Sequence, residues 1–330
     1  MSGTDPGAIV SSEVLEAHIA RLRAEVADPR VGINGPGSMS WHIFREWGVF
    51  LGGGRAILLQ LAHPFVAQAI EHHSRTRSDP LGRFQRTFDR IFAMSFGDLD
   101  RAIAAARRVH RVHRHVTGQL DHDIGGFSRG TPYAANTPEA LLWVHATLLD
   151  TAVQAFELCL GPLSEADKDA YYQEQKRFAY LFGIADEIMP RDWPAFCQYM
   201  DRMLASDVIA VSPHARDMAR FLFSSTRRFH RPLMEWVRVL STGMLPARLR
   251  DEFELPYGPR EERTYRASFR VIGTVYPRLP GRLRYSPAYV RIRRRLAGHP
   301  GPDRISDALE WLWNRIVDTR PGGVYSTRGS

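Results

Sequence analysis

The chain has little cysteine: only Cys159 and Cys197 occur among its 330 residues. A disulfide framework would need more cysteines, so we expect a reducing compartment and a cytoplasmic protein. The sequence also lacks Cys-x-x-Cys, His-Glu-x-x-His and Glu-x-x-His patterns. The sequence therefore does not predict a zinc ribbon, a zinc protease site or a ferritin-like di-iron site.

Long hydrophobic runs are missing too. The longest apolar stretch, residues 141–160, is interrupted by His145, Asp150 and Glu157, whereas a membrane-spanning helix needs about 20 nearly uninterrupted apolar residues. The first seven residues have neither the basic nor the apolar region of a signal peptide. We expect no membrane span, and a peripheral contact with a membrane stays open.

Acidic residues are outnumbered, with 36 Asp and Glu against 44 Lys and Arg, which gives a net charge of +8. Arginines are dense between positions 278 and 295. Such an excess is typical of a nucleic-acid or membrane-surface patch, and also of a solvated basic surface. Because no aromatic-interleaved RNA motif, zinc finger or helix-turn-helix accompanies the charge, we expect a solvated surface and no nucleic-acid partner.

Strand-like alternation is nearly absent, while helical periodicity runs along most of the chain. With 44% hydrophobic residues, the sequence predicts an all-α protein with a substantial core. We expect residues 121–138 to form a loop. The expected helices are residues 12–26, a segment from residue 41 onward, residues 79–96, residues 102–117, two segments that begin at residues 138 and 165, and residues 193–206, 213–223, 232–241, 246–253, 261–275 and 303–319.

Three glycines, Gly52 to Gly54, open the apolar segment that ends at residue 64. A phosphate loop is excluded, because no strand precedes this segment and no Gly-Lys-Ser/Thr closes it. We expect these glycines to let the backbone approach another helix or a flat ligand closely.

Two histidines fall on apolar helix stripes. On the helix over residues 102–117, His113 recurs with Ala102, Ala106 and Val109 at steps of three and four, so we expect it to point inward, with His110 at the edge of the stripe. His145 lies on the apolar stripe of the next helix, so we expect it to point inward as well. Each is either a core histidine with a hydrogen-bond partner or a metal ligand, since an unpaired buried imidazole costs about 1–3 kcal/mol.

Arg83 and Thr87 lie four residues apart and share a helix face with aromatic side chains. An inward arginine there requires an anion, which is either a ligand or a structural salt-bridge partner. An inward imidazole, inward arginines and many aromatic side chains together suit haem, whose iron needs one proximal imidazole and whose propionates need cationic partners.

Several motifs appear in a recognisable order. They are the segments over residues 53–64, 79–87, 108–113, 131–136 and 142–148, followed by Pro162-Leu163-Ser164, Tyr171-Tyr172-x-Glu174, Leu245-Pro246 and Leu255-Pro256-Tyr257. Together they resemble the MpaB-type oxygenase family, which shares its catalytic domain with the latex-clearing rubber oxygenases. The resemblance covers about residues 40–260.

The resemblance implies a b-type haem (heme b) in a globin-like helical core with additional helices. The family's proximal iron ligand falls on His113. Arg83, Arg86 and Thr87 match its distal residues, with arginine in place of lysine, and these three are our candidate catalytic residues. His145 takes the place of a further family histidine with a supporting or propionate role, and Arg55 and His63 lie in family motifs that imply packing or propionate contacts.

We expect three parts of one domain: an N-terminal helix and linker over residues 1–39, a haem-binding domain over residues 40–260, and C-terminal helices over residues 261–330 packed on it. The predicted function is a haem-dependent oxygenase or peroxygenase that uses dioxygen or peroxide on a small apolar metabolite of unsaturated or isoprenoid type. Polymer cleavage is not expected without an export signal or membrane anchor. The alternatives are a non-catalytic haem sensor or carrier, and a basic helical scaffold without cofactor.

Overall fold

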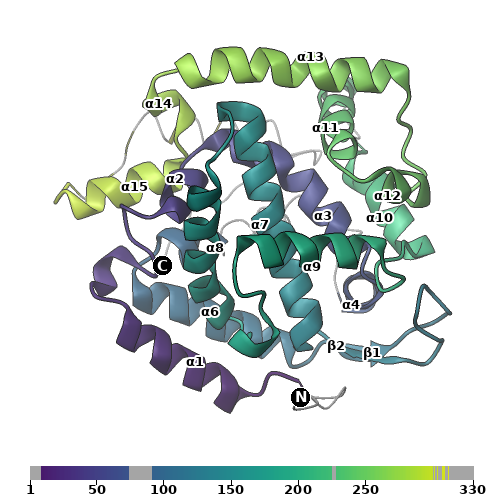
Figure 1. The fold of residues 1–330 in the computed structure, drawn as a ribbon, viewed down its shortest axis with the longest axis horizontal. Coiled ribbons are helices and arrows are strands. Elements are labelled where there is room, and N and C mark those ends of the chain that lie inside the picture. Colours follow the sequence, from purple (N-terminus) through teal and green to yellow (C-terminus); the bar gives the residue numbers. More distant parts are fainter. Residues whose placement is uncertain are drawn as a thin grey trace.

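The computed structural model describes residues 9–73, 91–224 and 228–299, together with positions 301, 303, 307, 308 and 311. Over these residues the protein is all-α, as the sequence predicts, with one short two-stranded hairpin (Figure 1). The globin-like arrangement stays a prediction. The elements of the first half are α1 (Ser12–Glu25), η1 (Pro29–Val31), α2 (Met39–Phe44), η2 (Trp47–Gly52), α3 (Gly53–Leu61), α4 (Pro64–His73), α6 (Leu99–His113), β1 (Thr117–Gln119) and β2 (Pro132–Ala134).

The second half is helical in all its regular elements that the structure describes. They are α7 (Pro138–Leu160), α8 (Glu165–Tyr180), η3 (Asp186–Ile188), α9 (Trp193–Ala205), α10 (Pro213–Leu222), η4 (Arg228–His230), α11 (Arg231–Gly243), α12 (Ala247–Glu252), α13 (Pro259–Val275), η5 (Tyr276–Arg278), α14 (Gly281–Arg284) and α15 (Pro287–Leu296).

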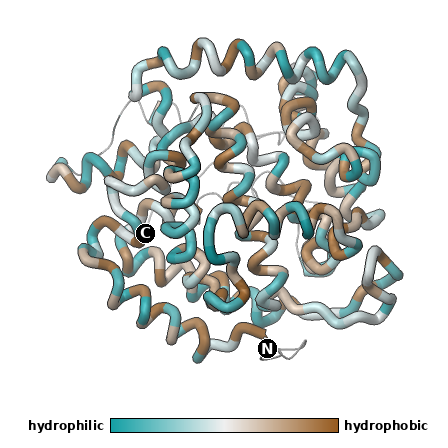
Figure 2. The backbone as a smooth tube through the Cα atoms, in the orientation of Figure 1, coloured by the Kyte–Doolittle hydropathy of each residue, from teal (hydrophilic) through white to brown (hydrophobic). Residues whose placement is uncertain are grey.

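The helix α7 runs through the middle of the molecule and organises the fold (Figure 1). Pro138 occupies its first turn, where a missing N–H costs nothing. Its 23 residues contact η2, α3, α8, α2 and α13. A helix surrounded in this way must be apolar on most sides, and Figure 2 shows α7 as a largely hydrophobic tube.

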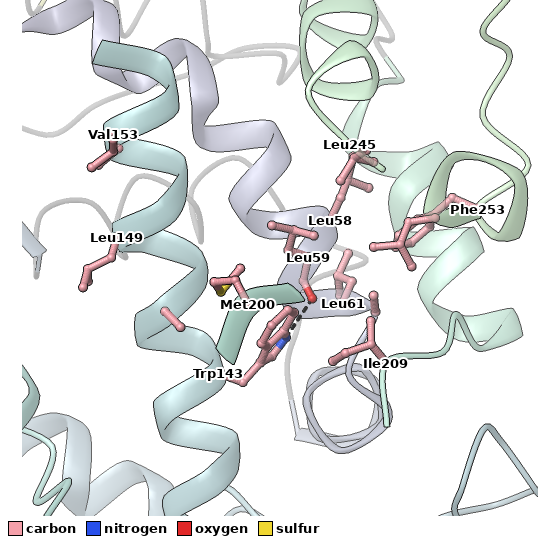
Figure 3. Packing of buried hydrophobic residues seen from close by; sticks show 14 of the residues in the cluster. Leu58, Leu59, Leu61, Trp143, Leu149, Val153, Met200, Ile209, Leu245 and Phe253 are labelled. Carbon is pink, nitrogen blue, oxygen red and sulfur yellow. Dashed lines mark hydrogen bonds between the residues drawn. The ribbon is translucent and has the colours of Figure 1, made fainter. Parts of the chain in front are cut away.

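The main core fills the space between α7, α3 and the helices after α8 (Figure 3). Trp143 of α7 is completely buried, and its indole Nε1 donates a hydrogen bond of 3.0 Å to the carbonyl oxygen of Leu59. That carbonyl belongs to the last turn of α3, where backbone acceptors lack partners within the helix. One side chain thus adds packing area and satisfies a helix end.

The glycines before Arg55 serve helix packing, as one of the two sequence-based alternatives expects. A Cβ atom on Gly54 would stand 2.0 Å from the hydroxyl oxygen of Ser241 on α11, and one on Gly52 would stand 2.5 Å from the methyl group of Thr151 on α7. Both distances are far inside van der Waals contact. The missing side chains therefore let α3 and η2 approach α11 and α7.

The expected loop over residues 121–138 requires a correction, because β2 falls inside it and pairs antiparallel with β1. Thr117 aligns with Ala134, and Gln119 aligns with Pro132. Three-residue strands leave too short an alternation to be seen in the sequence. The α6 helix also ends at His113, four residues before the expected end.

Helices at both ends of the described chain pack against the central part. The α1 helix contacts α8 and α6, and α13 contacts α11 and α7. Among the described residues, no single helix has the length and apolarity to cross a membrane, while the bent pair of Trp47–Leu61 with Pro64–His73 satisfies those two criteria together.

Candidate functional site

A cavity of about 150 Å³ lies between α2, η2, α3, α4, α7, α8 and α10. Its walls are mainly apolar and include Phe44, Val49, Ile57, Leu148, Phe178 and Met218. An apolar cavity of this size stays dry and takes up a molecule of about the size of benzene. The cavity is therefore suited to a small apolar ligand.

Among the described residues, four polar side chains also line the cavity, and three of them form hydrogen bonds with other side chains. Gln60 donates to the hydroxyl of Thr147 at 3.2 Å, and Gln175 donates to the hydroxyl of Ser40 at 2.9 Å. The third, Thr151, accepts from the guanidinium of Arg55 at 2.6 Å.

The fourth is His145, which is 6% exposed and lies on the second turn of α7. Its ring stacks on Phe178 of α8, with centroids 5.6 Å apart and planes 7° from parallel. The ring atom Nδ1 is buried and has no hydrogen-bond partner within the part of the chain that the structure describes. An unsatisfied nitrogen at an apolar cavity destabilises the free protein. This cost favours an interaction of the nitrogen with a bound ligand.

The charge state of His145 follows from its burial. Desolvation lowers the pKa of the imidazole to about 4, and a hydrogen bond with the backbone of Gln175 acts in the opposite direction. The ring is therefore neutral near pH 7. A neutral imidazole has one donor and one acceptor nitrogen and is the form that ligates metals.

The depth of burial expected for the two histidines of α6 requires a correction. The buried histidine of α6 is His110, at 7% exposure, whereas His113 is half-buried in the last turn of the helix, with its Nδ1 shielded from solvent. His110 lies 3.5 Å from the hydroxyl of Ser12 on α1 and 3.3 Å from the amide nitrogen of Asn136. Because α1 and the turn before α7 cover this edge of α6, the buried stripe lies nearer His110 than periodicity alone indicates.

Arg55 is 2% exposed and bound on three of its nitrogens by protein groups. Nη2 donates to Asp150 at 2.6 Å, Nη1 to Thr151 at 2.6 Å, and Nε to the carbonyl of Met244 at 2.9 Å. These contacts tie α3 to α7 and to the end of α11. The resemblance implies either packing or propionate contacts for Arg55, and this geometry corresponds to packing.

His63 lies at the junction of α3 and α4, 3% exposed. Its Nδ1 accepts a hydrogen bond of 3.2 Å from the backbone N–H of Phe65, and its ring packs near Phe65 and Phe127. Burial lowers the pKa of His63 to about 4. A neutral histidine that caps a helix start and contacts two aromatic rings is suited to a structural role.

Three candidate catalytic residues, Arg83, Arg86 and Thr87, lie outside the described residues, as does most of the helix expected over residues 79–96. The cavity lining includes Ile91, the first residue described after that segment. The assignments of these three residues stay predictions.

Sequence reasoning did not find several cavity residues, including Phe44, Gln60, Gln175 and Phe178. Their common signal is a position on the inner face of a helix, which marks any core residue equally well.

The segment Gly126-Phe127-Ser128-Arg129-Gly130 matches a Gly-x-Ser-x-Gly pattern. Ser128 is exposed in the hairpin loop and is not followed by a helix, so it does not form a nucleophile elbow.

Over the described residues, no group of three or more His, Cys, Asp and Glu side chains is arranged to hold a metal ion. Haem iron differs in needing a single imidazole from the protein. The imidazole of His145 is neutral, has an unsatisfied nitrogen and lines the apolar cavity, and the Nδ1 atom of His113, the ligand that the resemblance implies, is shielded from solvent. The volume enclosed by the described residues, about 150 Å³, corresponds to a small molecule.

A protein-family model described as "ER-bound oxygenase mpaB/B'/Rubber oxygenase, catalytic domain" matches residues 41–274. Uncharacterized protein Mb2261 of Mycobacterium bovis and Uncharacterized protein Rv2237 of Mycobacterium tuberculosis are each 28% identical over 174 residues. These matches cover 51% of this chain and 65% of each relative, so the chain spans somewhat less than two thirds of their length. No solved structure matches this chain significantly.

Proposed function

Because the chain belongs to the family of the ER-bound oxygenase mpaB/B'/rubber oxygenase catalytic domain, we propose that it is a haem b-dependent oxygenase or peroxygenase. Its substrate is a small apolar metabolite of unsaturated or isoprenoid type, oxidised with dioxygen or peroxide. The observation that carries this proposal is the apolar cavity with one neutral imidazole in its wall, inside the matched region. We further propose a cytoplasmic location, on the ground of two free cysteines.

In this proposal the side chain of His113 holds the haem iron. His113 lies in the last turn of α6, where the chain turns toward β1. Haem, when bound, supplies an iron centre that activates dioxygen or peroxide, the chemistry that side chains alone lack. Arg83, Arg86 and Thr87 would offer charge-assisted hydrogen bonds to the oxidant.

The cavity residues select and position the substrate. Phe44, Ile57 and Leu148 offer apolar contacts, which favour a hydrocarbon over a polar metabolite at about 25 cal/mol per Å² of buried apolar surface. The same walls exclude water from the reacting part of the molecule. His145 contributes the nitrogen that a single polar substituent of the substrate, or the edge of the cofactor, can satisfy.

The test of substrate binding fills the cavity while leaving the surface unchanged. Leu148→Trp places a larger side chain in the wall, and Val14→Trp, at a position 40% exposed on α1, is the matched control. With haem-loaded protein and a panel of alkenes, we expect Leu148→Trp to lose at least tenfold in kcat/KM while Val14→Trp keeps wild-type turnover. The absorption spectra of the variants show whether haem is retained.

Two outcomes contradict the proposal. Stoichiometric haem without turnover of any alkene, with either dioxygen or peroxide, indicates the non-catalytic sensor or carrier. A colourless protein that does not respond to added haemin indicates a family fold without the cofactor.

A further inference from the structure

The α13 helix has two faces of opposite character. Tyr265, Phe269 and Ile272 form its inner stripe and pack in a cluster with Leu240 and Met244 of α11 and Cys159 of α7. The opposite side of the helix carries arginines and small residues, which recur at steps of three and four and are exposed to solvent. They are Arg263, Arg266, Ala267, Arg270 and Thr274. In Figure 1 this helix lies along one edge of the molecule, and α14 follows at its end.

Positive charge on this segment is in large excess. Residues 259–299 contain eleven arginines and only two acidic residues, Glu261 and Glu262. Arg266 pairs with Glu262, and Arg284, Arg294 and Arg295 pair with carboxylates elsewhere.

Four of the remaining arginines have no such partner. Arg260, Arg263, Arg270 and Arg282 are exposed, and none forms an ion pair with any residue that the structure describes. Three of them, Arg260, Arg263 and Arg270, lie on α13, and exposed cations without an ion-pair partner favour an anionic partner.

Apolar side chains are exposed within the same segment. Val271 and Val275 on α13 are 60% and 50% exposed, and Leu283 on α14 is 49% exposed. Exposed aliphatic residues contribute little to a solvated helix or to a phosphate backbone. Their burial is favourable where apolar material lies directly beneath a layer of negative charge, as it does in a bilayer of anionic phospholipids.

From this combination we infer that the exposed surface of α13, defined by Arg263, Arg270, Val271 and Val275, docks on the surface of an anionic phospholipid membrane. The arginines contact headgroup phosphates, and the two aliphatic side chains enter the boundary between headgroups and acyl chains. These four residues lie outside the stripe that packs on α7 and α11, so docking leaves the core unchanged. The inference is independent of the oxygenase proposal.

Vesicle co-sedimentation tests the inference with the full chain. We expect binding to vesicles of phosphatidylglycerol and phosphatidylcholine at low salt, and none to pure phosphatidylcholine. Each arginine near an anionic surface accounts for about a fivefold change in affinity, so Arg263→Gln with Arg270→Gln weakens binding about 25-fold. Val271→Ser with Val275→Ser weakens binding without altering net charge.

The control removes the same charge elsewhere. Arg23→Gln with Arg107→Gln changes two exposed arginines on α1 and α6, and we expect wild-type binding from it. Equal losses in both double arginine variants would show a general effect of net charge and overturn the inference. So would wild-type binding from the serine variant, or binding to a single-stranded oligonucleotide but not to vesicles.

Discussion

The clearest prediction concerns the buried ion pair between Arg55 and Asp150, which links α3 to α7. The Arg55 side chain is 2% exposed and that of Asp150 is 18% exposed, with 2.6 Å between Nη2 and Oδ2. Asp150→Ala leaves the guanidinium buried without its counterion, held only by Thr151 and the carbonyl of Met244. Removal of one partner of a buried pair costs about 3–5 kcal/mol, a large part of a typical unfolding free energy of about 5–15 kcal/mol.

Urea unfolding followed by circular dichroism measures this loss as a shift of the midpoint at constant slope. Glu16→Ala is the control, because it breaks a pair with Arg107 in which the two side chains are 48% and 46% exposed. We expect that loss to stay below about 1 kcal/mol. The double replacement Arg55→Met with Asp150→Leu should recover most of the stability, since it removes both charges together. Equal losses from Asp150→Ala and Glu16→Ala would refute a structural role for Arg55.

Two further predictions follow from helix packing and from buried histidines. Gly54→Ala should destabilise the protein although alanine is the better helix former, because the new Cβ would stand 2.0 Å from the hydroxyl oxygen of Ser241. Adding Ser241→Gly should restore part of the lost stability. In the same urea unfolding experiment the control Gly273→Ala, whose Cβ would have its nearest neighbour at 3.4 Å, should be neutral or stabilising. The pKa values of His63 and His145 are lowered to about 4 in the folded chain, so the unfolded chain binds more protons between pH 6.5 and 4 and stability should fall as pH falls through that window, by on the order of 3 kcal/mol for each histidine. Replacing both with glutamine should flatten the haem-free protein's stability there, and an unchanged slope would count against their burial in the neutral form.

Helix positions were the most predictable part of this fold, because their signals are local. Ser11 caps α1 and Ser164 caps α8, each by accepting a hydrogen bond from a backbone N–H of its own first turn. Pro138 begins α7 at the predicted residue. Such signals act over three or four residues and do not depend on the tertiary structure.

The sequence analysis does not predict the helix α15, because four of its ten residues are arginines and indicate a surface charge. Ser286 caps this helix, and Tyr289 and Ile292 are buried in a small cluster with Trp41 of α2.

The candidate site was less predictable, because its geometry depends on contacts between distant segments. The carboxylate that binds Arg55 lies 95 residues away in the sequence. The burial of His110 in place of His113 depends on α1, which lies 98 residues before it and covers one edge of α6. His145 could be predicted as inward because α7 is buried on most sides, so its orientation does not depend on one neighbouring helix.

The central claim is a haem held by His113, and spectral titration with haemin tests it most directly. Three proteins are compared: wild type, His113→Ala and His110→Ala, the last being the neighbouring histidine that the structure buries more deeply. Our account predicts a Soret band that saturates near one haem per chain in wild type and in His110→Ala, and that is lost in His113→Ala. Full haem retention in His113→Ala would contradict the assignment of the iron ligand, and a wild-type protein without a Soret band would contradict the haem-dependent function itself.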